Sequence, residues 1–147
     1  MFNQIFGQNE INLIIDLCLC FGAGFLIGAE RESRGKDAGI STHTMVIIGS
    51  MLFTYLSSLV DPASKSRIAA QIVSGIGFLG AGLIVKDGAN VKNLTTAASI
   101  WATGAVGMAY GFNYHVIGTI VAVVVAFIPR IPHINKKSPE SILERKK

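Results

Sequence analysis

The sequence is poor in charged residues. Only 15% of its 147 residues are Asp, Glu, Lys or Arg, against about 25% in ordinary soluble domains, and 50% are hydrophobic. The mean hydropathy is +0.51. These values exclude an ordinary water-soluble domain with a charged surface. We therefore expect one domain whose main partner is the lipid bilayer, with no nucleic-acid partner.

Cysteine is also scarce, and a secretory leader is not evident. Cys18 and Cys20 lie inside an apolar run, about 200° apart on a helix, so we expect small buried side chains rather than a disulfide or a shared metal. The first ten residues contain Glu10 but no Lys or Arg. A signal peptide begins with a basic region, so we expect the first apolar segment to be a retained span.

Motifs of catalysis and nucleotide binding are missing as well. There is no Walker loop and no H-E-x-x-H pair. "GIGFLGAG" does contain Gly75-x-Gly77-x-x-Gly80, the dinucleotide fingerprint, but it follows "RIAAQIVS", an apolar helix instead of a strand. His43 and Glu30 have the chemistry of an acid and a base, yet no nucleophile accompanies them. We expect neither an enzyme nor a nucleotide site.

Five apolar stretches are present, each close to the length of about 17 to 25 residues that crosses a bilayer as a helix. Charged residues fall almost wholly between them. The sequence therefore predicts an all-α integral membrane protein, a bundle of about five transmembrane helices. The expected spans are Ile11 to Ala29, Thr42 to Val60, Ile68 to Val85, Thr95 to Phe112 and Tyr114 to Ile128.

The basic residues of the loops predict the orientation. Eleven Lys and Arg fall in one set of alternate loops and two, Lys65 and Arg67, in the other. Since basic loops stay in the cytoplasm, we expect the N-terminus outside and the C-terminus inside. The domain plan is an outer segment 1–10, a transmembrane domain 11–128 and a short basic tail 129–147, with a short helix from Ser138.

Small residues occupy one arc of the third span, and bulky ones the other. On a helical projection the small and polar arc includes Gly75, Gly77 and Gly82, while Ile72 and Ile76 lie opposite. Because small residues allow close helix packing in membranes, we expect the small arc to face the bundle and the bulky arc to face lipid. The predicted helix-packing glycines are Gly24, Gly28, Gly75, Gly77, Gly80 and Gly82.

Polar stripes follow the second and fourth spans. His43, Ser50, Thr54, Ser57 and Ser58 align on the second. The fourth carries one stripe of Thr96, Ser99, Thr103, Gly107 and Tyr110, and another of Ala98, Ala102, Ala105 and Ala109. We expect the fourth span to be central and the fifth, which is nearly featureless apart from Thr119, to be peripheral.

Two polar clusters follow from the depths of these side chains. A carboxylate within a span, such as Asp16, is costly to bury and is a functional candidate, and we expect it to pair with Arg67. A purely structural ion pair between the first and third helices is the open alternative. The outer cluster is Asp16, Asp61, Arg67 and Gln71, and the cytoplasmic cluster is Glu30, Arg31, His43, Asn93, Thr95 and Thr96.

Three ordered motifs resemble a known family. "GAERESRGKDAGISTH", "RIAAQIVSGIGFLGAGLIV" and "NLTTAASIWATGAVGMAYGFNY" are similar to the membrane domain of the bacterial MgtC/SapB proteins, over residues 10–128. Asn93 replaces the family's usual Gly, "GIST" replaces "GLRT", and "ASK" separates Asp61-Pro62 from Ser66-Arg67. Known members continue into a soluble C-terminal domain after the fifth span. The present sequence has no counterpart of it, and we expect the membrane domain alone.

The resemblance implies a bacterial inner-membrane protein linked to magnesium homeostasis and, in pathogens, to survival inside host cells. Members are thought to modulate other membrane proteins, without a resident cofactor. The alternative is a transporter or channel for Mg²⁺ or another small ion, working as a homo-oligomer. Mg²⁺ prefers oxygen ligands, for which Asp16 and Glu30 are the metal-binding candidates.

Overall fold

The computed structural model describes residues 7–88 and 90–131, and its described part contains five α-helices. The helices are α2 (Gln8–Ser33), α3 (Ile40–Val60), α4 (Ser66–Leu83), α5 (Leu94–Gly111) and α6 (His115–Phe127). Strands β1 (Val85–Asp87) and β2 (Asn90–Lys92) and a short 3₁₀ turn η1 (Ile128–Arg130) complete the described elements. The expected tail helix from Ser138 lies outside the described residues.

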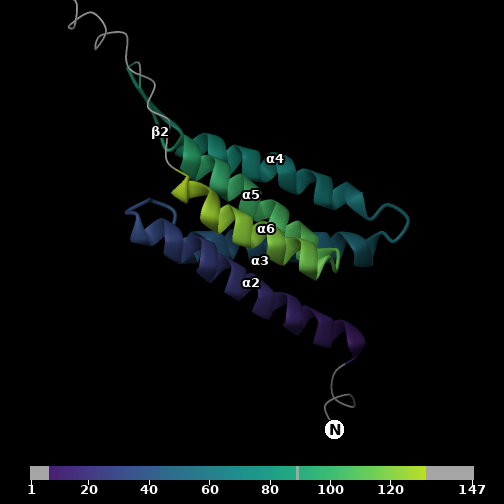
Figure 1. Cartoon of the computed structure of the whole chain (residues 1–147). Helices are drawn as coiled ribbons and strands as arrows, with labels where there is room; N and C mark the ends of the chain where they lie inside the picture. Colours follow the sequence, from purple (N-terminus) through teal and green to yellow (C-terminus); the bar gives the residue numbers. More distant parts are fainter. Residues whose placement is uncertain (1–6, 89, 132–147) are drawn as a thin grey trace, which may run out of the picture.

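The five helices form one bundle with α3 and α5 at its centre (Figure 1). Helix α4 packs on α3 and α5 from one side, and α2 packs on α3 and α6 on the other. The loop after α2, the β hairpin and η1 all lie at the same end. We call it the basic end, because Lys and Arg side chains gather there. They are Arg31, Arg34, Lys36, Lys86, Lys92 and Arg130.

Local sequence explains where the helices end. Gly35, with φ of +62°, follows Arg34 at the end of α2 and allows the left-handed turn that a side chain would resist. Asp61 precedes Pro62, which disfavours helical geometry in the residue before it, and α3 stops there. The turn between α5 and α6 is tight, with Asn113 at φ of +62°.

The five expected spans match the five helices, with small shifts of their ends. Three helices, α2, α3 and α4, are long and apolar enough to cross a membrane, and α6 is a shorter apolar helix. Helix α2 begins at Gln8, inside the segment expected to precede the bundle. Large apolar side chains such as Phe21, Phe78 and Trp101 are exposed. The protein is therefore a helical membrane protein in contact with lipid.

The antiparallel β hairpin was not predicted. Val85, expected to end the third span, instead pairs with Lys92 in the hairpin. The register places Asp87 opposite Asn90, and Gly88 adopts φ of +60° in the turn. Lys92 and Asp87 form an exposed ion pair of 2.8 Å. A strand of three residues is too short for hydropathy to distinguish from the end of an apolar helix.

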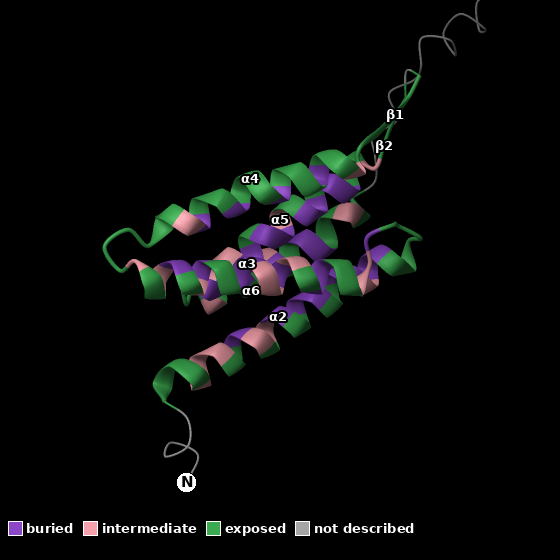
Figure 2. Ribbon diagram, turned by 180° about the vertical axis from the view of Figure 1, so that it is seen from behind, coloured by how far each residue is buried: buried purple, intermediate pink, exposed green. Residues whose placement is uncertain are grey.

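The expected orientation of α4 is wrong. Its buried residues are Ala69, Ile72, Ile76 and Gly80, so part of the bulky arc faces the bundle. Gly75, Gly77 and Gly82 are exposed, and a Cβ built on any of them meets no atom within 4 Å. Only Gly80 contacts another helix, with an ideal Cβ 3.6 Å from the Ala97 carbonyl oxygen of α5. Figure 2 shows α4 mostly exposed, with a narrow buried stripe.

Glycines of α2 and α5 make the closest helix contacts. A Cβ on Gly24 would lie 2.6 Å from Thr44 Cα, and one on Gly28 would lie 2.5 Å from Ile40 N. On α5, a Cβ on Gly107 would lie 2.8 Å from Ser50 Cβ and would collide with the Ile47 carbonyl. These glycines let the α2 and α5 backbones approach α3, as small residues do in membrane bundles.

Helix α5 is central, as expected, but one of its predicted faces differs. Its stripe of Thr96, Ser99, Thr103, Gly107 and Tyr110 is buried. Its second packing face consists of Ala97, Ile100 and Gly104, whereas Ala98 and Ala105 of the expected alanine stripe are exposed. Helix α6 is apolar and packs on α5 and α2. Four of its 13 residues are buried, against four of the 18 residues of α4.

Candidate functional site

A buried arginine joins α2 to the start of α5 at the basic end. Arg31 is 1% exposed, and its Nη2 donates a hydrogen bond of 2.5 Å to Thr96 Oγ1. Its Nε has no hydrogen-bond partner among the described residues. A guanidinium is always charged, so this contact holds a positive charge inside the bundle.

His43 lies one layer further along the same interior. Its ring is fully buried, with Nδ1 2.9 Å from the Gly39 carbonyl oxygen and Nε2 3.3 Å from Ser99 Oγ. Glu32 accepts a hydrogen bond of 2.9 Å from the Ile40 N–H and so caps the first turn of α3. The cytoplasmic cluster therefore connects α2, α3 and α5.

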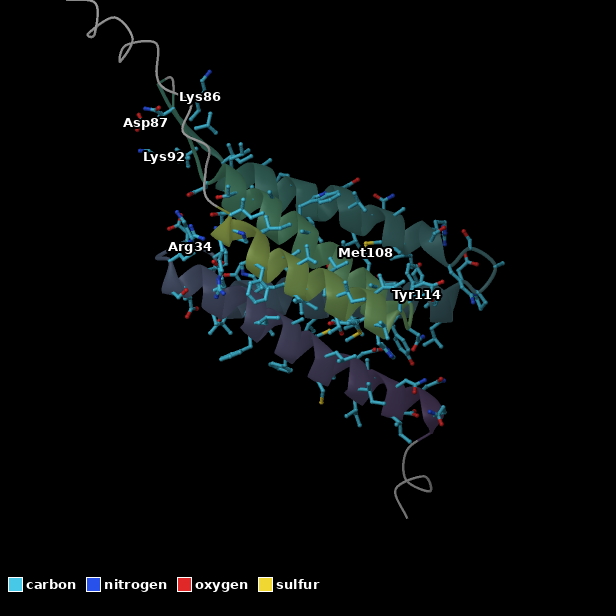
Figure 3. The ribbon with its side chains drawn as sticks, in the orientation of Figure 1. Arg34, Lys86, Asp87, Lys92, Met108 and Tyr114 are labelled. Carbon is cyan, nitrogen blue, oxygen red and sulfur yellow. The ribbon has the colours of Figure 1, made fainter. Side chains whose placement is uncertain are left out.

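Glu30 pairs with Arg34 at the end of its own helix, and Arg34 in turn reaches the end of α6. Its Oε1 is 3.5 Å from Arg34 Nη1, and Arg34 also donates a hydrogen bond to the Pro129 carbonyl of η1. Glu30 is only 6% exposed, and its second oxygen, Oε2, is buried without a hydrogen-bond partner in the described part of the chain. Arg34 lies between the ends of α2 and α6 in Figure 3.

Two members of the expected cytoplasmic cluster lie at its edge. Asn93 adopts φ of +63° directly before α5, without a side-chain hydrogen bond to the helix end. Thr95 is exposed, although its neighbour Thr96 is fully buried. The structure thus brings Arg31 together with Thr96 and His43 with Ser99, and leaves Asn93 and Thr95 outside the network.

The expected outer cluster does not assemble. Asp16 pairs with His115 at the start of α6, with Oδ1 2.7 Å from Nε2. Arg67 instead lies 3.5 Å from Asp61 in an exposed pair at the turn between α3 and α4. The predicted Asp16–Arg67 pair is therefore wrong, because Arg67 is on the exposed side of α4. Gln71 lines a groove of about 520 Å³ between α3 and α4.

Sequence reasoning missed His115. It lies within the expected fifth span, Tyr114 to Ile128, but is not among the candidate residues of that span, and it is the first residue of α6. The available signal was depth: Asp16 and His115 both lie toward the end opposite the basic one. A buried carboxylate requires a partner, so every titratable side chain at that depth was a candidate.

Buried hydroxyls connect the regions around these two sites. Ser57, Thr54 and Ser50 of α3 and Thr103 and Ser99 of α5 are all less than 9% exposed. Ser99 and Thr103 donate to carbonyls of their own helix, Thr96 and Ser99 respectively. Ser57 Oγ donates to the Lys65 carbonyl at 2.6 Å and accepts from the Ile68 and Ala69 N–H groups, which caps α4. These hydrogen bonds stabilise the helices.

The two metal candidates lie apart. Asp16 has His115 beside it, and Glu30 has Arg34. Across residues 7–88 and 90–131, no three His, Cys, Asp or Glu side chains are grouped as metal ligands. Each candidate therefore offers one carboxylate, the smallest number with which proteins bind Mg²⁺ alongside retained waters.

Comparisons with known proteins agree with the motifs. The profile of the MgtC family matches residues 17–134. Protein MgtC of Brucella abortus is 53% identical over 92 residues, which cover 62% of this chain and 39% of the relative. Protein MgtC of Salmonella typhimurium is 46% identical over 100 residues, 68% of this chain and 43% of the relative. The chain thus spans less than half the length of these relatives, and no solved structure matches it.

Proposed function

This chain belongs to the MgtC family, and we propose that it is a multi-pass protein of the bacterial inner membrane that serves magnesium homeostasis by modulating other membrane proteins. In this proposal it is not an enzyme and has no resident cofactor. The loop charges support a cytoplasmic basic end, since positive loops are retained inside. The N-terminus would then be outside.

The single observation that carries this proposal is the buried Arg31. Its guanidinium lies between α2 and α5 and is 1% exposed. A fixed positive charge in a medium of low dielectric constant repels a divalent cation strongly. The interior next to it is filled by the close contacts of Gly24 and Gly28 with α3. A closed bundle that exposes apolar surface fits modulation through contacts within the membrane.

Transport of Mg²⁺ by a homo-oligomer is the second candidate function. The observation in its favour is the run of buried hydroxyls between the Asp16–His115 pair and His43. Oxygen atoms are the ligands that Mg²⁺ prefers, and intramembrane carboxylates often mark ion pathways. Ser57, Ser99 and Thr103 already bond to backbone carbonyls, which favours a structural role for them. Thr54 Oγ1, by contrast, is buried without a partner among the described residues.

A flux assay separates the two functions. The purified chain is reconstituted into liposomes that contain a magnesium-sensitive dye, with the Asp16→Asn variant and protein-free liposomes as matched controls. For a modulator, we expect all three to admit Mg²⁺ at the same rate. A saturable flux in the wild type that Asp16→Asn abolishes would establish transport instead.

A growth assay tests the link to magnesium. We expect the chain to restore growth in low magnesium to a host that lacks its own copy, and a folded Arg31→Gln variant to fail. Full growth with the Arg31→Gln variant, or no restoration by a folded wild-type chain, would contradict the role assigned to the bundle.

A further inference from the structure

A cavity of about 560 Å³ lies on the outer surface, between the C-terminal parts of α2 and α6. Gly22, Phe25 and Leu26 of α2 line the part farther from the basic end, and Phe127 of α6 also lines the groove. Glu30, Ser33 and Arg130 line its part at the basic end. From Gly22 to Ser33 this groove follows about 16 Å of helix, the scale of part of an acyl chain.

The polar end of the groove carries a carboxylate oxygen without a hydrogen-bond partner among the described residues. Glu30 Oε2 is buried and has no hydrogen-bond partner in the described residues, while Oε1 faces Arg34 at 3.5 Å. A buried polar atom without a partner is destabilising, and more so when it is charged. A ligand that places an N–H⁺ group against Glu30 would remove this cost.

A positive charge stands on the opposite wall. The Arg130 guanidinium lies 4.8 Å from the centre of the Phe127 ring, a cation–π contact that holds it at the rim. Guanidinium groups bind phosphate through paired hydrogen bonds. The groove therefore presents an apolar channel and, at its basic end, a carboxylate that can accept from a cation and a guanidinium that can donate to a phosphate.

We propose that this groove binds a phospholipid with a primary ammonium headgroup, of the phosphatidylethanolamine class. The acyl chain lies along Phe25 and Leu26, the phosphate meets Arg130 and the ammonium meets Glu30. Phosphatidylglycerol offers the phosphate but no cation for Glu30. Phosphatidylcholine has a cation that lacks N–H donors, so it cannot hydrogen-bond to the carboxylate.

The test compares these three lipids on the full chain. Purified protein in detergent is titrated with phosphatidylethanolamine, phosphatidylcholine or phosphatidylglycerol of identical acyl chains, and bound lipid is counted by native mass spectrometry. We expect the ethanolamine lipid to bind about tenfold more tightly than the choline lipid, the ratio that one charged hydrogen bond provides. Equal binding of all three lipids would overturn the proposal.

Variants assign the contacts. Glu30→Gln is expected to remove the preference for ethanolamine over choline, whereas the exposed Glu10→Gln at the other end keeps it. Leu26→Trp fills the groove and leaves Glu30 intact, so it is expected to weaken all three lipids and serves if Glu30→Gln does not fold. An unchanged preference in Glu30→Gln, or unchanged affinities for all three lipids in Leu26→Trp, would place the lipid elsewhere and refute the assigned site.

Discussion

Helices α4 and α5 are both 18 residues long and rich in glycine, yet they occupy opposite environments. Gly104, Gly107 and Gly111 of α5 are buried against neighbouring helices, whereas Gly75, Gly77 and Gly82 of α4 have open space beside them. The same residue type therefore serves close packing in one helix and leaves an uncovered surface in the other. Three substitutions, in order of decreasing expected effect, test this contrast.

The largest effect is expected when a methyl group is added at a packed glycine. In Gly107→Ala the new Cβ would collide with the Ile47 carbonyl and lie 2.8 Å from Ser50 Cβ. We expect the free energy of unfolding to fall by about 3 kcal/mol, the upper part of the usual range for overpacking. Thermal unfolding in detergent measures it.

Gly75→Ala on α4 is the matched control. Nothing lies within 4 Å of its new methyl group, and alanine favours helix over glycine by about 1 kcal/mol, so stability should stay equal or rise. Equal losses in Gly107→Ala and Gly75→Ala would show that α4 is as tightly covered as α5, for example by a second copy.

A smaller effect is expected at the buried arginine. Thr96→Val removes the acceptor of the Arg31 hydrogen bond and leaves the guanidinium with one partner fewer in a buried place. We expect a loss of about 2 kcal/mol, as for a hydrogen bond to a charged group. The adjacent, exposed Thr95→Val should change stability by less than about 0.5 kcal/mol. Similar values for the two variants would refute the buried network.

The smallest effect concerns the attachment of α4. Ser57→Ala removes the hydroxyl that caps the first turn of α4 from α3, and we expect a loss of about 1 kcal/mol, typical of a helix cap. Ser58→Ala, whose hydroxyl bonds only to the Thr54 carbonyl of its own helix, should cost less. Hydrogen exchange at the start of α4 should rise only in Ser57→Ala, and unchanged exchange there would count against the cap.

Most of the secondary structure was predictable because its signals are local. Apolar runs, Asp61-Pro62 and Gly35 place the helices and their ends to within a few residues, and the hairpin was missed because each strand has three residues. The polar stripes of α3 and α5 were also predictable, since buried hydroxyls in a membrane face other helices. The partner of the buried Asp16 was not, because that partner, His115, is 99 residues away along the chain.

The sequence by itself determined a five-helix membrane bundle with one basic end, and the motifs of its family, because hydropathy, capping and loop charge act along the chain. Only the tertiary structure decided which face of α4 is buried and which side chain lies against Asp16. The physical reason is that lipid is as apolar as a protein interior. The hydrophobic effect therefore does not decide whether Ile72 and Ile76 face lipid or the bundle. Their burial depends on the shape of the neighbouring helix surface, to which the small residues Ala97 and Gly104 of α5 contribute.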